Sequence, residues 1–173
     1  SLFVILTAVA VTLSMPKVYM ASSRIAVRRD APDMQVGERQ QRQIDTYDPY
    51  FLRTQFEIIQ SRPILYEVIK NLRLAEYFGR IYNETGAPMS PQDAYNVLFK
   101  NMKVQQFRDT NLIEIRIYRS TYRSTKEAAR EYSARIANEV ASVYREQRMQ
   151  VNREEKRRGL DALTEAYAKQ VKQ

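Results

Sequence analysis

The sequence predicts an α+β protein with three parts: a membrane-proximal domain, a long projecting C-terminal helix and an N-terminal transmembrane helix. We expect the domain to contain a small antiparallel or mixed sheet and packed helices. Three observations support this class. Within residues 112–118, Ile113, Ile115 and Ile117 alternate with the charged Glu114 and Arg116, as in half-buried strands. Residues 124–173 contain no proline and repeat apolar residues at steps of three and four. The first fifteen residues carry no charge.

The composition excludes several kinds of chemistry. The 173 residues include neither cysteine nor histidine, so no thiolate, imidazole base or histidine metal site can form. The net charge is +8, but basic residues are interleaved with acidic ones over most of the chain. We therefore expect a solvated surface with a basic excess and no nucleic-acid partner.

Residues 1–17 are expected to form the outer part of a transmembrane helix that begins before Ser1. A full span needs about 20 apolar residues, and Pro16 and Lys17 end the run. A buried core helix and a cleavable signal peptide are the alternatives. The residues expected to contact the membrane are Leu2, Phe3, Val4, Ile5, Leu6, Val9, Val11, Leu13 and Met15, with Tyr19 at the interface.

The membrane-proximal domain is expected to cover residues 18–123. Its elements are a strand at 18–27, a long polar loop at 28–49, helices between 50 and 99, and a hairpin with strands at 103–107 and 112–118. Ser61 and Ser90 are the expected helix N-caps. Gly79 and the polar residues 83–88 are expected to interrupt the helical pattern.

Residues 124–173 are expected to form one helix. Its first part carries an apolar stripe from Ala129 to Tyr144 and packs on the sheet. The stripe nearly disappears between Arg145 and Gly159 and resumes from Leu160 onward. A helix of about fifty residues is about 75 Å long and exceeds the width of such a domain. The remainder should therefore project and meet a partner helix from a return segment beyond Gln173 or from another subunit.

The projecting helix carries a basic cluster, which is a candidate contact for an anionic polymer, a glycan or an acidic helix. The alternative is a solvated face stabilised by pairs such as Glu154 with Arg158. No phosphate loop or nucleophile elbow is present, so we assign no catalytic residue, cofactor or metal and expect no enzyme activity in this chain. The cluster consists of Arg145, Arg148, Arg153, Lys156, Arg157 and Arg158.

Four stretches resemble the bacterial polysaccharide co-polymerases, the chain-length determinant proteins of the Wzz type. They are the apolar run leading into VYMASSRIAV, residues 51–74, the pair KVQQF and TNLIEIRIY, and residues 124–138 continuing as EVASVYREQR. Their order carries the resemblance, which is nearest to the exopolysaccharide or tyrosine-kinase-associated branch.

The resemblance implies a membrane-anchored, ring-forming homo-oligomer that regulates chain length, polymerisation or export of a surface polysaccharide. Its implied partners are copies of itself, a polysaccharide polymerase, the growing glycan and the membrane. The domain would lie on the periplasmic side of the bacterial inner membrane, and a tyrosine kinase domain could follow elsewhere in the full protein. The alternative is an extracytoplasmic ligand-sensing domain of a membrane receptor. In a receptor the long helix would re-enter the membrane close by, whereas in the scaffold it would lead outward and return.

Overall fold

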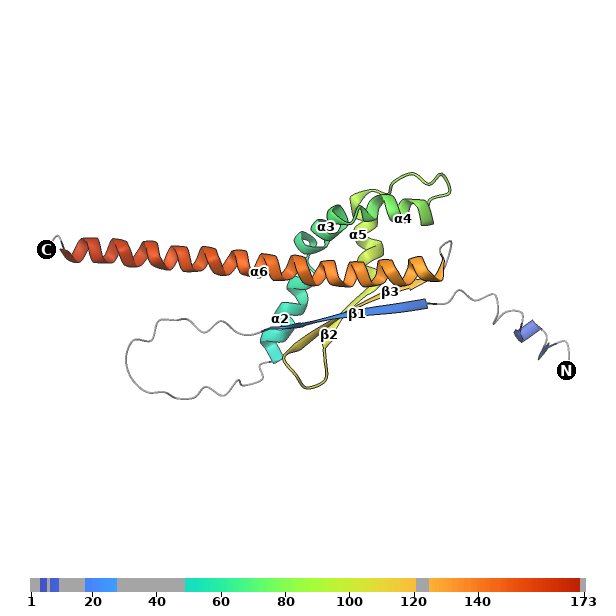
Figure 1. Cartoon of the computed structure of the whole chain (residues 1–173), viewed down its shortest axis with the longest axis horizontal. Coiled ribbons are helices and arrows are strands. Elements are labelled where there is room, and N and C mark those ends of the chain that lie inside the picture. Colours follow the sequence, from blue (N-terminus) through green and yellow to red (C-terminus); the bar gives the residue numbers. More distant parts are fainter. Residues whose placement is uncertain (1–3, 6, 10–17, 28–48, 121–124, 172–173) are drawn as a thin grey trace.

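The computed structural model describes residues 4–5, 7–9, 18–27, 49–120 and 125–171, and it has an α+β fold (Figure 1). A three-stranded antiparallel sheet is covered by helices, and a long C-terminal helix extends beyond it. The elements are β1 (Val18–Ala26), α2 (Pro49–Ile59), α3 (Arg62–Asn71), α4 (Leu74–Tyr82), α5 (Pro91–Lys100), β2 (Met102–Gln106), β3 (Leu112–Ser120) and α6 (Lys126–Val171).

Strand β3 lies at the centre of the sheet, in the order β1-β3-β2. The expected hairpin is confirmed, because β2 pairs antiparallel with β3 and Val104 lies opposite Ile115. Strand β1 pairs along the other edge of β3, where Ser23 lies opposite the same Ile115. This second pairing joins segments about 90 residues apart, and short-range sequence patterns contain no information about it.

The two faces of the sheet have different environments because successive strand residues point to opposite sides. Ile113, Ile115 and Ile117 are buried beneath the helices. In β1, alternate residues from Tyr19 to Ile25 are partly buried while their neighbours are exposed, and the strand expected at 18–27 is confirmed. The helices therefore cover one face of the sheet, and the other face carries Arg24, Glu114 and Arg116.

The helices on the covered face pack around one core. Helix α6 lies along β1 and β3, with α3, α4 and α5 on the same side of the sheet (Figure 1). The expected cap of α5 is confirmed, since the Ser90 hydroxyl accepts a hydrogen bond from the Asp93 amide at 3.1 Å. Ser61 occupies the N-cap position of α3 but its side chain makes no capping hydrogen bond. The proline in the first turn of α3 removes an amide that would otherwise lack a partner.

The boundary between α3 and α4 differs from the prediction. The helical conformation is interrupted at Arg73, which adopts a left-handed backbone conformation with φ of 50°. Glycine is the usual residue in this conformation, so an arginine at this position did not indicate the end of α3 in the sequence. Gly79 was expected to interrupt a helix, but it lies buried inside α4. A Cβ at Gly79 would lie 2.2 Å from the carbonyl oxygen of Ala87, so the glycine allows α4 to pack against the following backbone.

Helix α6 is continuous over 46 residues, which corresponds to about 69 Å. It runs in the direction of β1 and continues past the end of the sheet (Figure 1). The helix does not fold back at Gly159, where a Cβ would have no neighbour within 4 Å. The expected long projecting helix is therefore present.

The expected N-terminal transmembrane helix is wrong for this fold. No helix among the described residues is long and apolar enough to cross a bilayer. The helical residues described in this part are 4–5 and 7–9. Tyr19, the expected interfacial anchor, belongs to β1, where the Arg130 guanidinium lies 5.0 Å from its ring centroid.

Several expectations concern residues outside the described ranges. They include the polar loop at 28–49, except for Pro49, which begins α2. Among the expected membrane-contacting residues, Val4, Ile5 and Val9 are described and exposed. The others, which lie outside the described residues, are Leu2, Phe3, Leu6, Val11, Leu13 and Met15.

The same substitution should have opposite effects at two helical glycines. Gly79→Ala is expected to lower the free energy of unfolding by about 2–4 kcal/mol, because the added methyl group overlaps backbone atoms that cannot move independently. Gly159→Ala, the matched control, is expected to raise it by up to about 1 kcal/mol through helix propensity. Urea unfolding followed by circular dichroism measures both, and equal effects of the two variants would contradict the role assigned to Gly79.

Candidate functional site

The long helix α6 consists of an anchored part and a projecting part. Its side chains are buried at intervals up to Tyr144 and become almost entirely exposed after Gln150. Tyr144 donates a hydrogen bond of 2.6 Å to the side-chain oxygen of Gln55 on α2, and Arg148 donates one of 3.3 Å to the same atom. Burial raises the pKa of Tyr144, and the Arg148 charge opposes this rise. These contacts attach α6 to α2 just before the helix leaves the domain.

The projecting part of α6 exposes large apolar side chains. Met149, Leu160, Leu163 and Tyr167 are between 46% and 70% exposed. At about 100° per residue these four side chains fall within a narrow arc of the helix. We call them the outer stripe. A regular apolar arc on a solvent-exposed helix is the pattern that packs against another helix.

The outer stripe faces away from the core-facing side of α6. The buried residues of the anchored part, among them Ile136, Val140 and Tyr144, are centred about 150° around the helix from the outer stripe. The sequence predicts one stripe that fades and then resumes, but the second half lies on nearly the opposite side of the helix. A partner on the outer stripe would therefore approach from outside this domain.

The structure divides the predicted basic cluster. Arg148 packs at the domain boundary, where its guanidinium lies 6.0 Å from the ring centroid of Phe51. The other five side chains are exposed. Helical geometry places Arg145, Arg153, Lys156 and Arg157 within about a third of the circumference, and Arg158 on the other side. The exposed cluster consists of Arg145, Arg153, Lys156, Arg157 and Arg158.

The basic arc overlaps the outer stripe instead of lying opposite to it. Arg153 and Lys156 occupy the positions between Met149 and Leu160, at steps of four and three residues that continue the same seam. The projecting helix therefore presents a mixed surface of apolar side chains and cations. Such a surface suits a helical partner that supplies apolar contacts together with acidic groups.

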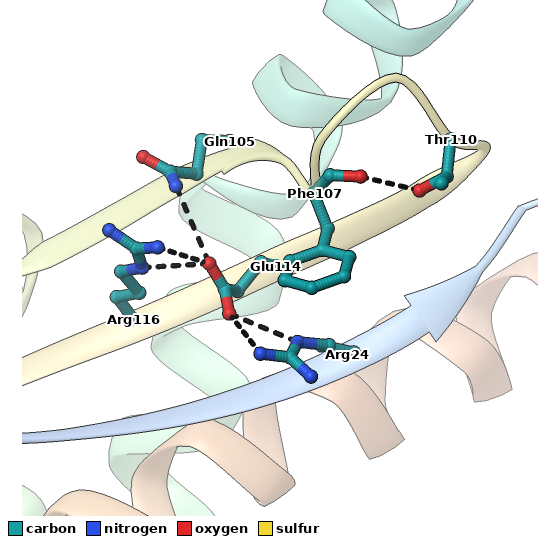
Figure 2. A network of polar contacts seen from close by, with 6 residues as sticks. All are labelled: Arg24, Gln105, Phe107, Thr110, Glu114 and Arg116. Carbon is teal, nitrogen blue, oxygen red and sulfur yellow. Dashed lines mark hydrogen bonds and ion pairs between the residues drawn. The ribbon is translucent and has the colours of Figure 1, made fainter.

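The open face of the sheet contains a buried carboxylate between two arginines (Figure 2). Arg24 on β1 donates from Nε to Glu114 Oε1 at 3.0 Å, and Arg116 donates from Nε to Oε2 at 2.8 Å. The Gln105 amide lies against the same group, and the Arg24 guanidinium covers the Phe107 ring at 3.8 Å from its centroid. The Glu114 side chain is only 2% exposed, whereas that of Arg24 is 49% exposed.

The charges of this cluster stabilise one another. Loss of hydration would raise the pKa of Glu114, but hydrogen bonds from Arg116 and Arg24 and their positive charges outweigh it, so the pKa is lowered. The hydrogen bond to Glu114 raises the pKa of Arg116 in turn. The cluster connects all three strands through side chains and stabilises the register of the sheet.

The sequence predicted which side of the sheet this cluster occupies, but not all of its contacts. Strand alternation places Glu114 and Arg116 on the side opposite the buried isoleucines, as expected. The contact with Arg24 depends on the pairing of β1 with β3, which the sequence pattern did not predict. Glu114 was therefore expected to face solvent, and its burial was missed.

A groove of about 320 Å³ lies between α3 and α6 and is lined mainly by polar side chains. Glu67 and Asn71 border it from α3, and Glu146, Gln147 and Gln150 from α6. No residue of the basic cluster lines it. Within the described ranges, no group of three or more acidic residues could hold a metal ion.

The chain matches no protein-family model, and comparison with curated proteins and with solved structures gives no significant match.

The Glu114 cluster predicts a specific loss of stability in acid. Because its pKa is lower in the folded state, Glu114 stabilises the fold above its unfolded pKa of about 4.3, and this contribution disappears as the pH falls through the folded pKa. Glu114→Gln should lower stability at pH 7 and flatten its decline below about pH 5. Urea unfolding at a series of pH values measures this.

Glu165→Gln is the matched control, because Glu165 pairs with Lys169 at 2.7 Å on the exposed part of α6. An exposed pair of this kind contributes little to stability. Parallel pH profiles for wild type and Glu114→Gln would contradict the role of the buried carboxylate.

Proposed function

We propose that this chain is a non-catalytic, self-associating scaffold in the assembly of a bacterial surface polysaccharide. The observation that carries the scaffold role is that α6 projects beyond the sheet (Figure 1). Helical geometry turns its exposed outer stripe away from the core-facing side. The polysaccharide assignment comes from the four stretches that resemble chain-length determinant proteins. The two parts of the proposal therefore have separate support.

The direction of α6 favours the scaffold over a ligand-sensing receptor domain. A receptor helix would return to the region where its domain begins. Here α6 begins beside the start of β1, and its C-terminal end lies at the opposite end of the molecule (Figure 1). A helix leading outward can present one surface to several neighbours, as a ring requires.

In this scaffold each subunit would contribute α6 to a shared helical wall, with the outer stripe against a neighbouring copy. Arg157 and Arg158 would then lie outside the line of the stripe, where they can contact the growing glycan or the polymerase. On the same resemblance, we propose that the domain acts on the periplasmic side of the inner membrane. The proposal assigns no reaction to this chain.

Self-association should depend on the outer stripe. The triple variant Leu160→Gln, Leu163→Gln and Tyr167→Gln is expected to weaken association by at least about 100-fold, because three apolar contacts are lost. Its thermal unfolding midpoint should stay near that of wild type, since none of these side chains packs on the domain. Sedimentation equilibrium over a range of concentrations measures the effect.

Single substitutions test the direction of the stripe. Met149 and Val151 are 46% and 45% exposed and lie on different sides of α6. Met149→Gln should weaken association, and Val151→Gln should have little effect. A wild-type chain that stays monomeric at every concentration, or equal effects of the two variants, would contradict self-association through the outer stripe.

Polymer length should depend on the basic cluster. Replacing Arg153, Lys156, Arg157 and Arg158 by Gln removes cations whose side chains are exposed and is expected to leave folding intact. The length distribution of the polysaccharide from producing cells, resolved on a gel, should shift. The control replaces four exposed cations of the globular part, Arg53, Arg80, Lys100 and Lys103, by Gln. An unchanged distribution in the first variant would remove the cluster from the proposal.

A further inference from the structure

Arg119 is a buried cation near the end of β3. Strand alternation places it on the same face as Ile113, Ile115 and Ile117, so its side chain enters the layer beneath the helices. Only 3% of the residue is exposed. Arginine is rarely buried to this extent without a partner.

Aromatic rings surround the guanidinium group. Its central carbon lies 5.0 Å from the ring centroid of Tyr77 and 5.1 Å from that of Phe78, both on α4. Tyr77 in turn stacks on Tyr132 of α6, with ring centroids 3.6 Å apart. The faces of these rings attract a cation, but they provide no oxygen to accept hydrogen bonds from its edge.

The hydrogen-bond donors at this position lack acceptors. Arg119 Nε and Nη1 are buried without a hydrogen-bond partner, and the Tyr77 hydroxyl is likewise buried without one. Nε carries one hydrogen and Nη1 carries two, so three N–H groups and one O–H group are unsatisfied. Burial raises the pKa of Tyr77. The charge of Arg119 and the interaction of its guanidinium with the Tyr77 oxygen oppose this rise but do not outweigh it, so the hydroxyl keeps its proton at neutral pH.

Two further cations lie close to this aromatic group and cannot neutralise Arg119. The Arg135 guanidinium lies 5.4 Å from the ring centroid of Tyr132, and its carboxylate partner is Glu131 at 3.9 Å. Arg130 lies over Tyr19, which is opposite Arg119 in the sheet register. A buried guanidinium among further cations is costly unless an anion accompanies it.

We propose that Arg119 and the Tyr77 hydroxyl form a binding site for a small oxyanion, either a carboxylate or a phosphate group. The unsatisfied Arg119 nitrogens are donors only, the Tyr77 hydroxyl can also donate, and the guanidinium is a permanent cation, so the ligand must supply acceptor oxygens and negative charge. Tyr77 as a whole is only partly buried, although its hydroxyl is buried. The ligand would accept N–H and O–H hydrogen bonds that have no acceptor within the described part of the chain.

The test compares anions at constant ionic strength. Thermal unfolding of the full chain is measured in chloride alone, with added inorganic phosphate and with added acetate. Phosphate, acetate or both should raise the midpoint, because a ligand that binds the folded state stabilises it. In a ¹⁵N NMR titration, the Nε–H signal of Arg119 should move with the same apparent dissociation constant.

Arg119→Met keeps most of the side-chain volume but removes every donor. Its apparent dissociation constant for the anion should rise at least about 10-fold. Arg135→Met is the matched control, because Arg135 also covers a tyrosine ring but has a 52% exposed side chain. This variant should respond to anions as wild type does.

The anion that stabilises wild type more identifies the preferred oxyanion. Identical midpoints in chloride, phosphate and acetate would overturn the site, as would an Arg119→Met protein with the wild-type response. If Arg119→Met does not fold, the Arg119 Nε–H signal of wild type decides, because a signal that phosphate and acetate leave unchanged excludes binding there.

Discussion

The pairing of β1 with β3 is the interaction on which the rest of this structure depends. Nine residues of β1 lie opposite nine of β3, and the two strands together form the platform along which α6 packs. Their register brings Arg24 beside Glu114 on the open face and aligns the inward residues of both strands under the helices. Without this pairing, α6 would lose much of the surface that holds its first half.

Strand β3 carries a buried charge on each face, and the two have opposite surroundings. Glu114 is enclosed by arginine side chains that remain partly exposed, so its charge is balanced while its partners keep contact with water. Arg119 is enclosed by aromatic rings, and two of its nitrogens have no acceptor. The first arrangement is complete within the chain and stabilises the sheet. The donors of Arg119 would find acceptors only when an anion is bound, so we assign this arrangement to ligand binding and not to stability of the fold.

The apolar side chains on the projecting part of α6 do not pack in the core of the domain. They gain nothing from this core, because the helix has turned them about 150° away from the core-facing side. Exposure of this apolar arc to water is unfavourable in an isolated chain, and its burial becomes favourable when another helix covers it. The cations along the same seam limit which partners can do so, since a partner must also balance their charge.

Local patterns in the sequence determined the elements of this protein: the alternation in β3, the Ser90 cap and the uninterrupted helical spacing of α6 depend on neighbouring residues and were predictable from them. Contacts between distant segments were decided only by the tertiary structure. The break at Arg73 carries no glycine signal, Gly79 serves a close approach to Ala87, and the burial of Glu114 and Arg119 depends on which segments cover them. The physical reason is that helix and strand periodicity acts over a few residues, whereas burial and charge pairing depend on groups brought together by folding.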